Sequence, residues 1–256
     1  MNVRTPSTSV LGAKRVGKPE RRQRREPNMR KQAVRAIAHL ARPLEWICLR
    51  SLKLLYRLFF LSMLHDESWQ EQLFALIPPK VGDRILEFGP GSAWTAVSLA
   101  ARFPDANIVG VDPDPKTVDK ANRLIARRKI RNVAVIESPH PSRLPLSAGS
   151  FDKSICLLTF HRHSPEEKLV LAKESLRVLR RGGALYVADY DKPANREERI
   201  LLGIAAYVSK KRTAVQSHVD GSWARYLKDA GLAGVRRRAS CSVTIGRVTM
   251  ITARRP

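Results

Sequence analysis

From residue 66 onward the chain alternates short apolar runs with longer helical stretches. The short runs are rich in β-branched residues, which is typical of strands. We expect strands at residues 84–88, 107–111, 133–136, 153–158 and 184–188. We expect helices at residues 68–76, 94–102, 116–127 and 166–180. Because strands that alternate with helices form parallel sheets with right-handed crossovers, this order predicts an α/β fold.

Two further apolar runs close the pattern, at residues 234–242 and 247–253. They follow each other without a helix between them, so they suit an antiparallel pair at the edge of the sheet. Together with the five earlier runs they would make a sheet of seven strands, mostly parallel, with helices on both faces and a C-terminal hairpin.

The N-terminal quarter has a different pattern. Residues 1–29 are rich in Arg, Lys, Pro and Ser and hold few large apolar residues, so we expect a disordered basic tail. Residues 30–65 are expected to form a helical extension, and residues 66–256 the α/β domain. The most apolar run of the chain lies within that extension, at residues 44–64.

Three cations divide this apolar run. Arg50, Lys53 and Arg57 fall on one stripe of the expected helix, which argues against a segment that spans a membrane. A helix that lies in a membrane interface would place the stripe at the lipid headgroups. The alternative is a helix that covers the α/β domain and buries its apolar face there.

Charge and cysteine content indicate the kind of partner and the cellular compartment. The chain has a formal net charge of +24, and residues 1–64 hold 15 Lys or Arg against 3 Asp or Glu. Such an arm favours an anionic partner, either a nucleic acid or an acidic membrane surface, although a solvated tail would have the same composition. Three dispersed cysteines and a start without an apolar signal segment predict a cytoplasmic protein, with contact to the inner membrane if residues 44–64 dock there.

Glycines follow the first expected strand, in Glu87-Phe88-Gly89-Pro90-Gly91. Glycines at this point let the backbone turn tightly and approach a ligand, which in such sheets lies beyond the carboxyl ends of the strands. A dinucleotide fingerprint would need a small residue at position 94, where Trp94 stands, and the loop lacks the Lys of a P-loop. The loop therefore indicates a different ligand.

An acidic residue ends the second expected strand. Asp112 lies at the position from which a carboxylate can accept hydrogen bonds from both hydroxyls of a ribose. The alternative is a turn or helix-cap residue, because Pro113-Asp114-Pro115 follows.

The order of these motifs resembles the class I S-adenosylmethionine-dependent methyltransferases, in particular the ubiquinone/menaquinone-biosynthesis-like group. The resemblance runs from about residue 70 to the C-terminus. Further matching segments are Val109-Gly110-Val111-Asp112, Leu144-Pro145-Leu146 through Asp152, Leu176-Arg177-Val178-Leu179 through Gly183, and Leu227 through Leu232. It implies a Rossmann-like fold and S-adenosyl-L-methionine as cofactor.

The resemblance also implies which residues would hold the cofactor. Glu87, Gly89 and Gly91 would line its methionine portion, Asp112 its ribose, and His140 would stand where the family often has an acidic residue facing the adenine. The whole predicted set is Glu87, Phe88, Gly89, Gly91, Asp112, Pro113 and His140. Ala93 replaces the last glycine of the motif, a change that disfavours a positive φ.

Methyl transfer is a displacement in which the cofactor supplies the electrophile and the protein supplies orientation, so the sequence assigns no catalytic residue. His161 is a candidate base, or a histidine at a helix start with no chemical role. Asp189-Tyr190-Asp191 could border the acceptor or form a turn ahead of Pro193. No set of residues has the spacing of a metal site.

The sequence thus predicts a methyltransferase that acts on a small-molecule or lipid-like acceptor. One alternative is an RNA methyltransferase that uses the basic arm for phosphate contacts, which would lack a recognisable RNA-binding module. Another is a cofactor-binding protein of the same fold without transfer activity.

Overall fold

The structure is a computed structural model, and it describes residues 51, 54, 67–91, 93–140, 142–208, 212–243 and 246–256. All of these belong to one compact unit, residues 48–256. The predicted basic tail, and all but residues 51 and 54 of the predicted helical extension with its interfacial segment, lie outside the described residues. The domain start at residue 66 stays a prediction.

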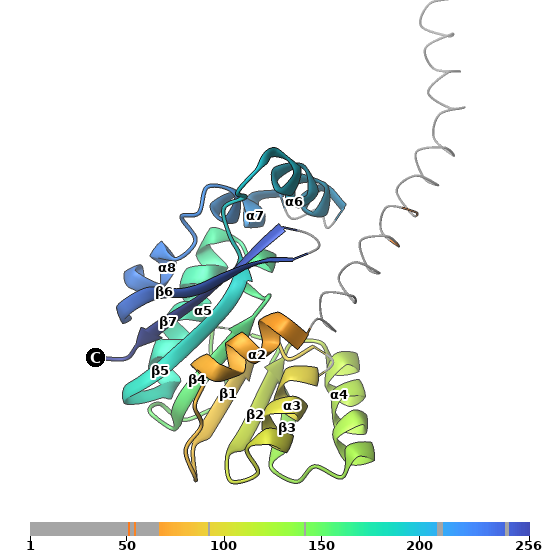
Figure 1. Cartoon of the computed structure of the whole chain (residues 1–256). Helices are drawn as coiled ribbons and strands as arrows, with labels where there is room; N and C mark the ends of the chain where they lie inside the picture. Colours follow the sequence, from red (N-terminus) through yellow and green to blue (C-terminus); the bar gives the residue numbers. More distant parts are fainter. Residues whose placement is uncertain are drawn as a thin grey trace, which may run out of the picture. The chain divides into compact units, whose positions relative to one another are not determined.

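A seven-stranded sheet forms the centre of the molecule, in the order β3-β2-β1-β4-β5-β7-β6 (Figure 1). The first five strands pair in parallel, and β7 pairs antiparallel with both β5 and β6. The strands are β1 (Arg84–Phe88), β2 (Asn107–Asp112), β3 (Val133–Glu137), β4 (Phe151–Leu157), β5 (Leu179–Tyr190), β6 (Ala233–Val243) and β7 (Gly246–Arg254). This architecture confirms the fold predicted from the sequence.

Helices cover both faces of the sheet, which separates two apolar cores (Figure 1). They are α2 (Glu67–Leu76), α3 (Trp94–Arg102), α4 (Pro115–Arg128), η1 (Phe160–Arg162), α5 (Pro165–Val178), α6 (Arg196–Val208), α7 (Arg212–Val219) and α8 (Arg225–Asp229). One core joins α2, α3 and α4 to the sheet, and the other joins α5 and α8 to its opposite face. No helix in the described part of the chain has the length and apolar character needed to cross a bilayer.

Local signals explain where the central helices begin. Ser164 and Glu167 form a capping box at the start of α5, and Pro165 takes its first position, which needs no amide donor. Asp114 caps α4 by accepting a hydrogen bond from the Lys116 amide, ahead of Pro115. Each of these helices therefore starts immediately after a strand end and its loop, which places the loops side by side at the carboxyl edge of the sheet.

Two expectations change. The helix expected to run to Arg180 ends at Val178, because Leu179 is already extended and pairs with Phe151 as part of β5. Helices α6 and α7, which the sequence reading did not identify, follow the carboxyl end of β5. They therefore lie at the end of the sheet that carries the candidate site (Figure 1).

Candidate cofactor-binding site

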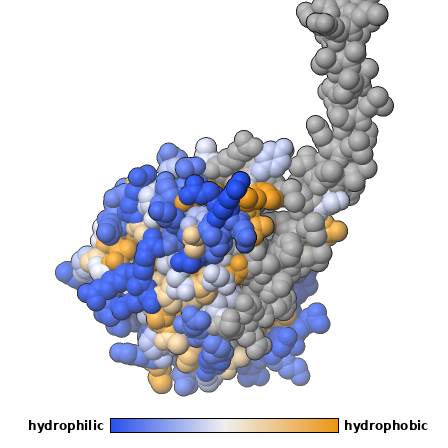
Figure 2. Space-filling model, turned by 45° about the horizontal axis from the view of Figure 1, so that its top comes forward, coloured by the Kyte–Doolittle hydropathy of each residue, from blue (hydrophilic) through white to orange (hydrophobic). Residues whose placement is uncertain are grey.

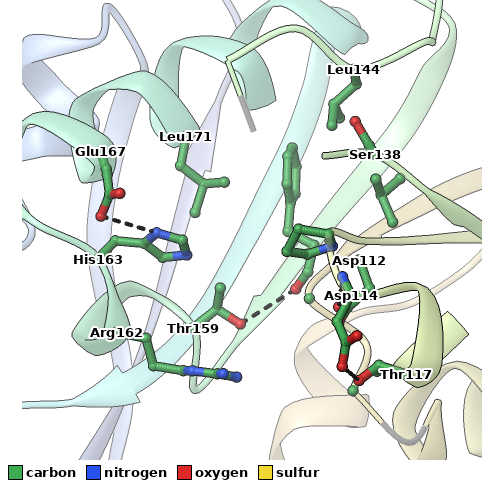
Figure 3. A pocket seen from close by; sticks show the side chains of 15 residues that line it. Asp112, Asp114, Thr117, Ser138, Leu144, Thr159, Arg162, His163, Glu167 and Leu171 are labelled. Atoms are coloured by element: carbon green, nitrogen blue, oxygen red, sulfur yellow. Dashed lines mark hydrogen bonds and ion pairs between the residues drawn. The ribbon is translucent and has the colours of Figure 1, made fainter. Parts of the chain in front are cut away.

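A cavity of about 320 Å³ opens at the carboxyl ends of β1, β2 and β4. Figure 3 shows two walls, with Asp112, Asp114 and Thr117 on one side and Arg162 and His163 on the other. The residues that line it are Phe88, Gly89, Gly91, Val111, Asp112, Pro113, Asp114, Thr117, Ser138, Leu144, Thr159, Arg162, His163, Glu167 and Leu171. Five of the seven predicted cofactor residues therefore meet in one cavity.

The conformation of the loop between β1 and α3 explains why the loop contains glycines. Gly89 has a φ of 63°, and a Cβ there would lie 3.0 Å from Thr159 Oγ1. Gly91 also has a positive φ, of 54°. Ala93, where the family motif has glycine, adopts a φ of 58° as well. An alanine in the left-handed region is strained, so the loop keeps the motif's conformation at some cost in free energy.

A glycine in β2 is a further site residue that the sequence reading did not single out. A Cβ on Gly110 would lie 2.8 Å from Pro90 Cγ and 3.1 Å from Val135 Cγ2. Only a residue without a side chain lets the loop after β1 pack onto the neighbouring strand. The available signal was a glycine inside an apolar strand, which often marks the close approach of another backbone.

Asp112 has the turn role considered for it, and it also lines the cavity. Its Oδ1 accepts a hydrogen bond from the Asp114 amide at 3.0 Å, which shapes the turn into α4. Asp114 in turn accepts from the Lys116 amide and the Thr117 hydroxyl. The side chain of Asp112 is 8% exposed and lines the cavity, and its Oδ2 has no partner within the described residues. One carboxylate oxygen thus orders the turn, and the second is available to a ligand.

Glu87 lies at the end of β1 and does not form part of the cavity wall. The residue is 2% exposed, and Thr95 and Ala96 of α3 donate hydrogen bonds to it. Its Oε2 is buried and has no partner among the described residues. Burial raises its pKa to about 8, although the two hydrogen bonds oppose the shift. A buried carboxylate with an unpaired oxygen behind a glycine loop fits the ammonium group of an amino-acid ligand.

The opposite wall comes from η1 and the start of α5. His163 Nδ1 lies 3.5 Å from Glu167 Oε2. Arg162 is exposed, and its guanidinium has no ion pair or hydrogen bond in the described part of the chain. In Figure 3 it extends beneath Thr159 toward the side of Asp114 and Thr117. The cavity therefore contains an unpaired cation opposite its carboxylates.

His140 and His161 lie outside the cavity wall. His140 is exposed, because the chain turns after β3 with the Ser138 hydroxyl donating to the His140 carbonyl at 3.4 Å. Ser138, rather than His140, lines the cavity. The predicted adenine contact of His140 stays a prediction.

His161 is buried beside Asp189, which lies near the carboxyl end of β5. Its Nδ1 lies 2.8 Å from Asp189 Oδ1, and its amide donates to Asp189 Oδ2 at 3.2 Å. Burial opposes the ionisation of Asp189, but His161, His218 and the Tyr190 amide outweigh it and lower its pKa to about 2. An ionised aspartate therefore holds the Nδ1 side of His161, which leaves Nε2 as the nitrogen that can accept a proton.

Comparison with known proteins agrees with this geometry. Residues 85–183 match the family model described as a methyltransferase domain. A 27-O-demethylrifamycin SV methyltransferase from Amycolatopsis mediterranei is 28% identical over 148 residues, which cover 54% of this chain and 53% of that protein. A demethylmenaquinone methyltransferase from Thermus thermophilus is 32% identical over 133 residues, covering 52% of this chain and 59% of that protein. The chain thus spans between half and three fifths of the length of these relatives.

A solved structure of an S-adenosylmethionine-dependent methyltransferase from Aquifex aeolicus aligns with a TM-score of 0.56 at 19% identity. The alignment covers 73% of this chain and 89% of that one, and it shows a shared fold. The family match over residues 85–183 and the shared fold agree on a methyltransferase domain of the class I S-adenosylmethionine-dependent type. Within that class the chain is similar to the ubiquinone/menaquinone-biosynthesis group, and the class and cofactor predicted from the sequence are confirmed.

Proposed function

We propose that this protein transfers a methyl group from S-adenosylmethionine to a small-molecule or lipid-like acceptor. The observation that carries the proposal is the combination, at the carboxyl ends of the strands, of a glycine loop, a cavity-lining carboxylate at the end of β2 and a buried carboxylate with an unpaired oxygen. The two relatives named above are a 27-O-demethylrifamycin SV methyltransferase and a demethylmenaquinone methyltransferase, which supports a small-molecule acceptor.

The residues present would hold the cofactor by its charged and hydroxyl groups. Asp112 would accept hydrogen bonds from the ribose hydroxyls through Oδ2. Glu87 would receive the ammonium through Oε2, and Arg162 would pair with the carboxylate at the amino-acid end. When bound, the cofactor supplies an electrophilic methyl group. The protein's contribution is orientation, because the reacting atoms must lie in line and in contact.

A base could act on an acceptor that must lose a proton. We propose His161 for this role, through Nε2, with Asp189 as the group that positions the ring and stabilises its protonated form. The two residues that follow it, Arg162 and His163, line the cavity, so His161 lies beside the site. The proposal applies to phenol, enol or similar acceptors, whose nucleophile forms when a proton leaves.

The decisive experiment has two parts. Titration calorimetry of the full chain with S-adenosylhomocysteine should show binding, and no binding at near-millimolar ligand would refute the assignment of the site. Incubation with deuteromethyl S-adenosylmethionine and a metabolite extract should then yield a labelled low-molecular-weight product by mass spectrometry. Label that appears only in RNA would refute the small-molecule acceptor, and binding without any labelled product would indicate a cofactor-binding protein without transfer activity.

The base is tested separately. Asn in place of His161 should remove most of the labelled product and leave cofactor affinity unchanged, and Asn in place of Asp189 should shift the pH dependence of the rate. Equal rates for the His161→Asn variant and the native chain would show that the acceptor needs no base from this residue.

A further inference from the structure

The C-terminal hairpin concentrates positive charge at one edge of the sheet. Residues 230–256 contain six arginines and neither Asp nor Glu. Strand β6 is the outermost strand on that side, so one of its edges faces solvent. Charged residues on an edge strand discourage pairing with another sheet. That role alone does not require the arginines to gather on one face.

Three of these arginines line a single groove. The groove has a volume of about 540 Å³ and lies between the end of α2 and strands β5, β7 and β6. Arg236 and Arg238 of β6 both line the groove, although the pairing with β7 shifts register between Arg237 and Ala239, and Arg254 comes from β7. Arg238 Nε donates a hydrogen bond to Thr252 Oγ1 at 2.9 Å, which holds its guanidinium at the groove. Among the residues that the structure describes, no carboxylate lines the groove.

The intervening arginine shows that this arrangement is specific to one face. Arg237 points to the other side of the sheet, where it forms an ion pair with Asp191 and donates to the Gly221 carbonyl at 3.1 Å. The arginine that meets a carboxylate thus faces away from the groove, and the groove keeps its positive charge.

Apolar side chains form another part of the groove. They are Ala75, Leu76 and Pro78, from α2 and the segment after it, and Ala184 of β5. Nearby, Val81 is 83% exposed in the turn that leads to β1. Tyr186 is the single aromatic residue among the described residues that line the groove, and it is only 8% exposed. A groove for single-stranded nucleic acid would offer exposed aromatic rings for base stacking, so the combination of guanidiniums and aliphatic carbons favours an anionic lipid over such a partner.

We propose that this groove docks the domain on an anionic membrane surface. Arg236, Arg238 and Arg254 would contact the phosphates of lipid headgroups, which a guanidinium binds with paired N–H donors. The apolar lining would contact the glycerol and upper acyl region. Figure 2 shows the hydrophilic surface on the side of the molecule that carries the hairpin and the C-terminus, with apolar residues showing between. The inference does not depend on methyl transfer.

Vesicle flotation with the full chain tests this surface. Vesicles of phosphatidylcholine with about a third of phosphatidylglycerol should bind the native protein, and pure phosphatidylcholine should not. The double variant Arg236→Gln with Arg238→Gln should bind the anionic vesicles roughly 25-fold more weakly, at about fivefold for each arginine near a charged surface. Its melting temperature and its affinity for S-adenosylhomocysteine should match those of the native chain.

A matched control removes the same charge elsewhere. Arg127 and Arg128 are exposed in the last turn of α4, which packs at the β2–β3 end of the sheet, far from the hairpin (Figure 1). Changing both to Gln should leave vesicle binding within about twofold, since these residues would face away from the bilayer. An equal loss in both double variants would show that net charge alone drives binding and would overturn the proposal. So would unchanged binding of the groove variant.

Two further experiments distinguish a lipid headgroup from free phosphate and from RNA as the source of the anion. Millimolar inorganic phosphate should not release the native protein from the vesicles; release would indicate a site for free phosphate. Likewise, a polyanionic RNA should not bind the native chain more tightly than it binds the Arg236→Gln/Arg238→Gln variant. A groove-dependent RNA affinity in the absence of vesicle binding would assign this face to nucleic acid and refute the lipid.

Discussion

Glu87 should release its proton when the cofactor binds. In the free protein its carboxyl group is buried, and its pKa is raised to about 8. At pH 7 about nine tenths of these groups are therefore protonated. A ligand ammonium beside Oε2 favours the charged form and would return the pKa to the ordinary range of a carboxyl group. Binding at pH 7 should thus release about 0.9 proton for each molecule of S-adenosylhomocysteine.

The same linkage sets the direction of the pH dependence. The free protein binds a proton that the complex does not, so affinity should rise with pH, by about tenfold between pH 6 and pH 7. Stability of the free protein should change in the opposite direction. The pKa of Glu87 is higher in the folded than in the unfolded chain, so its contribution is present at low pH and is lost as pH rises between 4.5 and about 8.

Calorimetry measures the proton directly. Titrations at pH 7 in two buffers with different ionisation enthalpies give the number of protons released from the change in observed heat. Glu87→Gln keeps the shape and removes the charge, so it should abolish proton release and weaken binding by roughly 10- to 100-fold, the scale of a charged hydrogen bond. Glu137→Gln removes an exposed carboxylate at the end of β3 and should change neither value.

A ligand control isolates the amino-acid end. Methylthioadenosine keeps the adenosine but lacks the ammonium and the carboxylate, so its binding should release no proton and should be equal in the native chain and in Glu87→Gln. If the native protein takes up S-adenosylhomocysteine without releasing a proton, or if release persists in Glu87→Gln, the role of Glu87 is wrong.

Three substitutions test the rest of the site. Asp112→Ala should weaken cofactor binding by about 1–3 kcal/mol, because it removes the ribose partner. Asp119→Ala, on the exposed face of α4, should leave cofactor binding unchanged. If calorimetry gives the Asp112→Ala variant the same affinity as the native chain, the ribose lies elsewhere. Ala93→Gly should raise the free energy of unfolding by about 0.5–1 kcal/mol in denaturant titrations, since it relieves a positive φ, and a loss of stability would contradict that strain. Gly110→Ala should lower stability by about 1–3 kcal/mol through its clash with Pro90, while Gly203→Ala in α6, where a Cβ meets nothing within 4 Å, should not destabilise the chain.

Local pattern was sufficient for most of the elements. The first strand and the helix after it have the predicted bounds, Arg84–Phe88 and Trp94–Arg102, because the change from a β-rich run to a helical run lies within a few residues. The end of α5 could not be located in this way. Leu179 leaves the helix to pair with Phe151, which lies 28 positions earlier in the chain, and such long-range pairing has no local signal.

Part of the candidate site could likewise be predicted from local pattern, and part could not. The glycine loop and Asp112 are encoded by residues at strand ends, and the parallel sheet brings those ends together without further information. The environment of Glu87 could not be read from its motif, because its raised pKa depends on how completely α3 buries it. Arg162 belongs to the cavity only because η1 follows β4 at the same edge.

The sequence by itself determined the class of domain, the cofactor and the strand edge at which the cofactor site lies. These follow from short motifs and from alternation along the chain, which are properties of neighbouring residues. Only the tertiary structure decided that Gly110 makes room for Pro90, that Asp189 holds His161, and that Arg236 and Arg238 share a groove with Arg254. Each of these depends on side chains that meet across elements, and packing rather than sequence order sets those distances.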